Sequence, residues 1–331
     1  MWTSSAPSER GGALLAVLWL SAALAAIAFS LATTVRGEAE RTSTAVDSLR
    51  SYYLATGAID RAIVWKVWSP LTSPEDDPRY YRPGIPMRFA FPGGEAVVDV
   101  IPESAKLNVN TAPVNVLTTL LLAFGLEPGR ADAIAQGIVD WRSPSPSGGF
   151  GPFDQFYLSQ NPSFRARHAS LEEIEELLYV RGITPDLFYG TYDRHPDTGR
   201  LVARPGLVDC LSVFGSTTRV DVNYAPAPVL VAMGVQPQIA AMIVERRRMR
   251  PFSQPGELAQ LGSLMGPAFS RLRIGGNSMF TLRATASLRQ ADGRLSDVRR
   301  GAAALLKIMP PGYDAPYHVL RWYDSVPPRE Y

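Results

Sequence analysis

An uncharged run of 23 residues, 13–35, constrains this 331-residue chain more than any other feature. As a helix it would be about 35 Å long, enough to cross a hydrocarbon core of ~30 Å. A buried core helix rarely runs so long without a polar face. The run is also too long for the apolar part of an ordinary secretory signal, and a single basic residue, Arg10, stands before it. We therefore expect one membrane-spanning helix over residues 12–36.

The helical pattern continues beyond the apolar run. Apolar residues such as Leu49, Ile59 and Ile63 recur at helical spacings, and Pro70 is expected to end the pattern. One helix over residues 12–69 would be about 87 Å long. We expect its first half to lie in lipid and its second half to pack one face on a globular body.

Short alternating segments on both sides of the chain's middle predict a sheet. The candidate strands are residues 89–91, 96–101, 280–288, 296–308 and 317–323. The Asp292-Gly293 pair between two of them is a hairpin signal. We expect all five strands to form one antiparallel sheet on the long helix.

The middle of the chain contains an internal repeat. The stretches NVNTAP and DVNYAP, which contain Asn110 and Asn223, each follow a short strand and precede an apolar helix. We expect both asparagines to cap these helices, with Ala-Pro in the first turn. Each helix ends at a glycine, Gly125 or Gly234, and a second helix follows. Each unit therefore looks like a helix-hairpin-helix.

Helix-hairpin-helix units commonly bind DNA through backbone N–H groups that face a phosphate. Here Pro128 and Pro237 have no N–H to offer, and Glu127 would repel phosphate. The formal net charge is only +2, so no global basic field attracts nucleic acid. The arginine-rich stretch 246–250 favours DNA binding, although arginines also suit a solvated helix end. A membrane-anchored helix-hairpin-helix DNA-binding protein stays open as the alternative function.

The sequence predicts a non-enzymatic protein. It contains no zinc-protease, nucleotide-binding or serine-hydrolase motif, which makes a hydrolase a remote third reading. His168, His195 and His318 are far apart and are predicted to be isolated surface residues. The acidic run 172–176 is predicted to lie on a solvated helix face. The single cysteine, Cys210, excludes an intramolecular disulfide and is predicted to be a core residue.

The start of the apolar helix, RGGALLAVLW, resembles the N-terminal segment of type IV pilins and pseudopilins. In that family a prepilin peptidase cuts after a glycine. The resemblance implies cleavage after Gly11, a leader of residues 1–11, and Gly12 as the new, methylated amino terminus. Most members carry Glu at the fifth mature position, which is Ala16 here. The minor pseudopilin of the K type in type II secretion also lacks this Glu and is unusually large.

Ordered motifs across the chain resemble the same K-type family, which carries a helical domain inserted into a pilin-like sheet. The Asn-x-Asn-x-Ala motif is followed by Asp140-Trp-Arg, a Gly-rich loop over 143–157, and a segment ending at Gly182. The implied fold class is α+β: a long N-terminal helix packed on an antiparallel sheet, with a large α-helical insert containing two helix-hairpin-helix-like units. The implied organisation is leader 1–11, transmembrane helix 12–36, pilin-like domain 37–109 and 276–331, and insert 110–275.

The resemblance implies a tip subunit of the type II secretion pseudopilus, without catalysis. The expected partners are other minor pseudopilins, the prepilin peptidase and the membrane, and no nucleic acid. The expected location is the inner membrane, single-pass, with the C-terminal body in the periplasm. Some family members bind calcium through acids that this chain replaces, leaving Asp140 and Asp154 as weak candidate ligands. Calcium takes six to eight oxygen ligands, so we predict weak or absent calcium binding and no cofactor.

Overall fold

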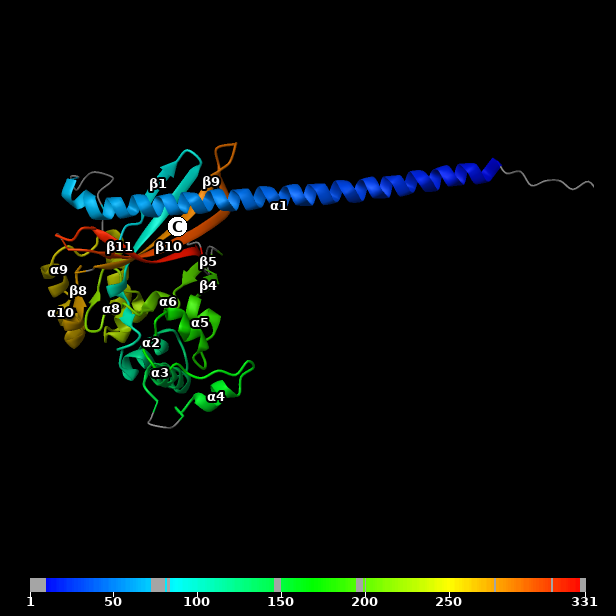
Figure 1. Cartoon of the computed structure of the whole chain (residues 1–331). Helices are drawn as coiled ribbons and strands as arrows, with labels where there is room; N and C mark the ends of the chain where they lie inside the picture. The colour runs from blue at the N-terminus through cyan, green and yellow to red at the C-terminus, as the bar shows by residue number, and fades with distance from the viewer. Residues whose placement is uncertain are drawn as a thin grey trace, which may run out of the picture.

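The computed structural model describes residues 10–72, 81, 84–145, 150–194, 199, 201–276, 278–310 and 312–327. Helix α1 (Arg10–Thr72) is a continuous 63-residue rod, and its N-terminal half projects far beyond the body (Figure 1). At ~1.5 Å per residue it is about 95 Å long. The predicted long helix is confirmed, but the prediction that Pro70 ends it is wrong by two residues. A proline this close to the C-terminus of a helix removes a single backbone hydrogen bond.

Five strands form one sheet in the order β1-β2-β9-β10-β11, and every neighbouring pair is antiparallel. Their bounds are β1 (Met87–Phe91), β2 (Gly94–Pro102), β9 (Met279–Arg289), β10 (Leu295–Ile308) and β11 (Tyr317–Val326). The predicted sheet is confirmed, including its last strand. Strands from the two ends of the chain meet where β2 pairs with β9. The segment between them must therefore leave the sheet and return.

The C-terminal half of α1 packs on this sheet and encloses a first hydrophobic core (Figure 1). Alanines dominate the contact on both sides: Ala55, Ala58 and Ala62 on the helix, and Ala96, Ala284, Ala286, Ala302 and Ala304 on the strands. Larger side chains such as Ile59 and Phe89 fill the space between. Small residues let the helix lie close to the strands, so the contact has little room for larger side chains.

The long excursion between β2 and β9 forms a helical part with a second, separate hydrophobic core. It holds two helix pairs, α2 (Val114–Ala123) with α3 (Pro128–Arg142), and α7 (Ala227–Ala232) with α8 (Pro237–Met249). The shorter helices are α4 (Asp154–Leu158), α5 (Pro185–Tyr189), α6 (Leu207–Cys210), α9 (Pro255–Ala259) and α10 (Gly262–Met265), and the 3-10 helices are η1 (Glu103–Ala105), η2 (Ile174–Tyr179) and η3 (Gly266–Arg271). In Figure 1 this part lies across the sheet from α1.

Short strands complete the helical part. β3 (Leu107–Asn108) pairs in parallel with β6 (Leu211–Ser212), and β7 (Val220–Asp221) with β8 (Leu272–Arg273). β4 (Thr191–Arg194) and β5 (Leu201–Arg204) form a separate antiparallel hairpin. Each copy of the sequence repeat therefore begins on a short parallel strand pair.

Candidate functional site

The apolar half of α1 holds the residues predicted for processing and assembly. Gly11 and Gly12 lie in the first turn of the helix, while residues 1–9 lie outside the described residues. Ala16 is exposed, and nothing lies within 4 Å of a Cβ atom placed at Gly12. Among the described helices, only this one is long and apolar enough to cross a membrane, with a fully exposed window of mean hydropathy 2.4. The segment is free to contact lipid or another helix.

The two repeat asparagines do not cap helices, so that prediction is wrong. The N-cap positions of α2 and α7 are prolines, and Asn110 and Asn223 lie three residues earlier. Asn110 instead donates to the carbonyl of Leu171 at 2.9 Å and accepts from its N–H at 2.7 Å. Asn223 makes the same two bonds with Phe252, both at 2.8 Å. Each asparagine therefore clamps a distant backbone segment.

A partly buried arginine completes each unit. Arg142 at the end of α3 donates to the carbonyls of Val109 and Ala112. Arg247 on α8 donates to two equivalent carbonyls, of Val222 and Ala225, each at 2.7 Å. Burial lowers the pKa of Arg247 to about 10. The second helix of each unit is thus fastened to the turn that precedes the first helix.

These contacts bear on the DNA-binding alternative. Arg246 lies over the ring of Phe252 and 3.5 Å from Glu257, and Arg250 lies 3.6 Å from the same carboxylate. Arg247 points inward, so the interpretation of the whole stretch as a solvated helix end is wrong for this residue. Pro128 and Pro237 are the first residues of α3 and α8. The arginine stretch is largely engaged within the chain.

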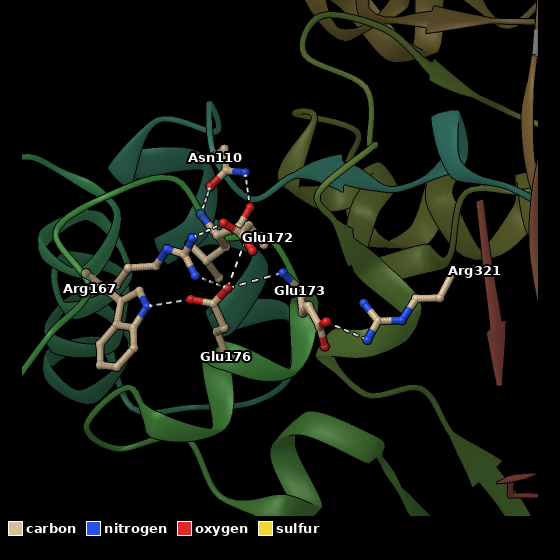
Figure 2. Close-up of polar contacts among 8 residues, drawn as sticks. Asn110, Arg167, Glu172, Glu173, Glu176 and Arg321 are labelled. Carbon is tan, nitrogen blue, oxygen red and sulfur yellow. Dashed lines mark hydrogen bonds and ion pairs between the residues drawn. The ribbon is translucent and has the colours of Figure 1, made fainter. Parts of the chain in front are cut away.

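The acidic run does not lie on a solvated helix face, so that prediction is also wrong. Glu173 caps the 3-10 helix η2, and the carboxylate of Glu176 accepts from the backbone N–H groups of Glu172 and Glu173 at 2.8 and 3.2 Å (Figure 2). Arg167 pairs with Glu172 and Glu176. The carboxylates of Glu173 and Glu176 therefore cap the start of η2.

One glutamate of this run joins the helical part to the sheet. Arg321 on β11 lies 2.5 Å from the Glu173 carboxylate (Figure 2). The hydrogen bond with Glu173 is the main reason that the pKa of Arg321 is raised above its ordinary value. Tyr81 and Tyr224 form a second link, through their hydroxyl groups. Polar contacts thus connect the two cores.

The structure brings Asp140 and Asp154 together, with His168 between them. His168 Nε2 lies 3.0 Å from both carboxylate oxygens of Asp154, and Nδ1 lies 3.2 Å from the carbonyl oxygens of Asp140 and Ser143. The histidine side chain is only 13% exposed. The prediction of an isolated surface histidine is therefore wrong at this position.

Burial and charge act in opposite directions on these groups. Burial raises the pKa of Asp140. Burial would also raise the pKa of Asp154, but hydrogen bonds from His168 and the Gly151 N–H outweigh it and the pKa is lowered. Burial would lower the pKa of His168, yet its bond with Asp154 and that residue's charge raise the pKa. His168 and Asp154 thus stabilise each other's charged forms.

These carboxylates do not suit calcium. Asp154 is occupied by His168 and by the Gly151 N–H at 2.8 Å, and no group of three or more His, Cys, Asp or Glu in the described ranges is arranged to hold a metal ion. Calcium takes six to eight oxygen ligands. Weak or absent calcium binding stays a prediction.

His318 is exposed on β11, as predicted, and His195 lies outside the described residues. Cys210 is buried and unpaired, as predicted for a core residue, and burial raises the pKa of its thiol.

Sequence comparisons point to one family. Residues 97–190 match the family model described as "Type II secretion system (T2SS), protein K". Type II secretion system protein K of Klebsiella pneumoniae is 26% identical over 200 residues, which cover 54% of this chain and 60% of that protein. The protein of the same name from Pseudomonas aeruginosa is 26% identical over 201 residues, 56% of this chain and 55% of that protein. The chain thus spans somewhat more than half the length of these relatives.

The fold is similar to a solved structure described as the GspK-GspI-GspJ complex of the enterotoxigenic Escherichia coli type 2 secretion system. The TM-score is 0.52 at 16% identity, covering 85% of this chain and 98% of that one. The fold class is therefore the predicted one: a long N-terminal helix on an antiparallel sheet, with a helical part inserted between its strands. The sequence matches show that the chain is similar to type II secretion protein K over part of its length. No comparison favours the DNA-binding alternative.

Proposed function

We propose that this chain is a non-enzymatic minor pseudopilin that forms the tip of a type II secretion pseudopilus. The observation that carries the proposal is the pilin-like helix on a sheet, combined with a large helical insert in a chain related to protein K. That family is a structural part of the secretion system, and assembly requires no chemistry from the described residues.

The apolar half of α1 anchors the chain in the inner membrane as a single pass. Its length and its complete exposure support this assignment. The pilin-like domain of residues 37–109 and 276–331 and the insert of residues 110–275 then lie in the periplasm. The insert widens the body on the side away from α1, which would block the addition of a further subunit above it (Figure 1).

The missing carboxylate at Ala16 fits the topmost position. In the family, Glu at the fifth mature position neutralises the amino terminus of a neighbouring subunit. An unpaired charge in lipid is costly. Ala16 cannot pair with an amino terminus, which suits a subunit with no other above it. The partners are then other minor pseudopilins, the kind of assembly that the solved GspK-GspI-GspJ complex represents.

Processing by a prepilin peptidase tests the proposal directly. Co-expression with the peptidase should remove residues 1–11 and leave a methylated Gly12, which the mass of the mature amino terminus will show. Gly11→Leu should block the cut, whereas Gly37→Leu, in the same helix but away from the cut, should not. A chain that stays intact, or is cut elsewhere, would overturn the proposal.

A binding experiment with candidate partners distinguishes pseudopilin assembly from DNA binding. The mature chain should form a complex with the I-type and J-type minor pseudopilins of its own secretion system. The DNA-binding alternative would be supported if the chain binds neither pseudopilin but binds DNA in a gel-shift assay. Its affinity for DNA should then fall steeply as the salt concentration rises.

A further inference from the structure

The His168 cluster is not explained by assembly, and its geometry defines the charge on the ring. A neutral imidazole carries one N–H and can donate on one side only. Here acceptor oxygens face both nitrogens: the Asp154 carboxylate at Nε2, and the carbonyls of Asp140 and Ser143 at Nδ1. Both contacts are satisfied only when the ring carries both protons. The arrangement of oxygens around the ring thus fits the imidazolium form.

The elements that meet at His168 show what this cation does. Asp140 and Ser143 stand at the C-terminal end of α3, where the last helix carbonyls carry partial negative charge. Asp154 is the first residue of α4. The ring thus ties two helix ends together, across the loop that connects them.

We propose that the His168 imidazolium holds the C-terminal end of α3 to the start of α4 in the way that a bound divalent cation would, and that the insert consequently folds and stays stable without metal. The inference concerns how the insert is stabilised and does not depend on the proposed function. It follows from the failure of Asp140 and Asp154 to suit a metal ion.

The oxygens that a divalent cation would need are already used. Asp154 accepts from the Gly151 and Ala166 N–H groups as well as from His168. Asp140 accepts from the Phe153 N–H, and its Oδ2 is the one oxygen of the pair that is buried without a hydrogen bond among the described residues. One available oxygen does not make a calcium site.

Packing leaves no space for an additional group beside Gly151. A Cβ atom placed on Gly151 would lie 2.6 Å from His168 Cε1 and 2.7 Å from Asp140 Oδ1. The glycine, the carboxylate and the ring are therefore in close contact. A cation entering here would also meet the positive charge of the ring, which opposes binding.

The test compares thermal unfolding of the full chain in detergent, with excess calcium chloride and with a chelator. The wild-type midpoint should be the same in both. His168→Asn removes the cation while keeping a residue that tolerates the left-handed backbone at this position, where φ is 49°. We expect this variant to unfold at a lower temperature and to regain part of the loss in calcium, because the buried Asp154 and the partly buried Asp140 are then left without a counter-ion.

Two further variants complete the design. His318→Asn, on the exposed surface of β11, should leave the midpoint unchanged under every condition. Gly151→Ala should lower it by displacing the ring, without making it respond to calcium. A wild-type midpoint that falls in chelator or rises in calcium would overturn the proposal. So would a His168→Asn protein as stable as the wild type.

Discussion

At the scale of single residues, the most informative are the two asparagines of the repeat. Asn223 is buried, and its amide satisfies both the N–H and the carbonyl of Phe252. Removing one partner of a buried hydrogen bond leaves the other without compensation, which is why a clamp of this kind is costly to lose.

We therefore expect Asn223→Ala to reduce the free energy of unfolding by about 2–3 kcal/mol. Urea unfolding of the full chain in detergent measures this loss. Asn115→Ala is the matched control, because Asn115 is exposed at the start of α2, and it should change stability by less than about 0.5 kcal/mol. Equal effects from the two substitutions would contradict the clamp.

The His168–Asp154 pair makes stability depend on pH. A raised pKa in the folded state means that His168 stabilises fully below its ordinary value of 6.5 and loses this contribution as the pH rises through the folded value. The lowered pKa of Asp154 has the opposite sign: its contribution is present above 3.8 and is lost as the pH falls. The pair therefore stabilises most between 3.8 and 6.5.

The expected result is that wild type and His168→Asn differ more in unfolding free energy at about pH 5.5 than at about pH 9. Parallel urea titrations at the two pH values give this difference. A difference that does not change with pH would show that His168 contributes only by packing.

At the scale of elements, the contact between α1 and the sheet is close because both surfaces present alanine. Ala284 is fully buried and lies between Val98 of β2 and Ala302 of β10 in the register. Extra methyl groups have no space in such a contact and force the neighbouring side chains or the backbone to move.

Ala284→Leu should thus destabilise the protein by about 1–3 kcal/mol, although leucine is the more hydrophobic residue. Ala291→Leu, in the exposed turn between β9 and β10, should be neutral within about 0.5 kcal/mol. Urea unfolding measures both. A more stable Ala284→Leu protein would show that the helix can move away from the strands at no cost.

The elements that sequence predicts well are those whose signal is local. The apolar run, its continuation at helical spacing and the alternating strands predict α1 and the sheet, because period and length are enough there. The roles of Asn110, Glu176 and His168 were predicted wrongly. Asn110 bonds to Leu171, 61 residues away, and His168 to Asp154 across a loop. Capping rules describe only neighbours within one turn, so a distant partner that competes for the same side chain cannot be read from them.

At the scale of the whole molecule, two hydrophobic cores are joined through polar contacts. The ion pair between Arg321 and Glu173 is short, yet both side chains are about 40% exposed. Exposed pairs contribute little because water and salt screen them.

Arg321→Ala should therefore lower stability by no more than about 1 kcal/mol, and less in high salt. Arg88→Ala, on the exposed side of β1, is the control for loss of an arginine from the sheet. Unfolding in low and high salt tests this. A loss of several kcal/mol, insensitive to salt, would mean that Arg321 organises the junction by packing.

The uninterrupted course of α1 has a consequence for orientation. Because one helix continues from the apolar run into the body, the direction in which the body faces is fixed by the rotation of the embedded segment about the helix axis. One residue inserted between Arg36 and Asp47 would turn the body by about 100°. Seven would return it to within about 20° while raising it by roughly 10 Å. Angular phase, and not length alone, would then decide which surfaces of the body meet its neighbours.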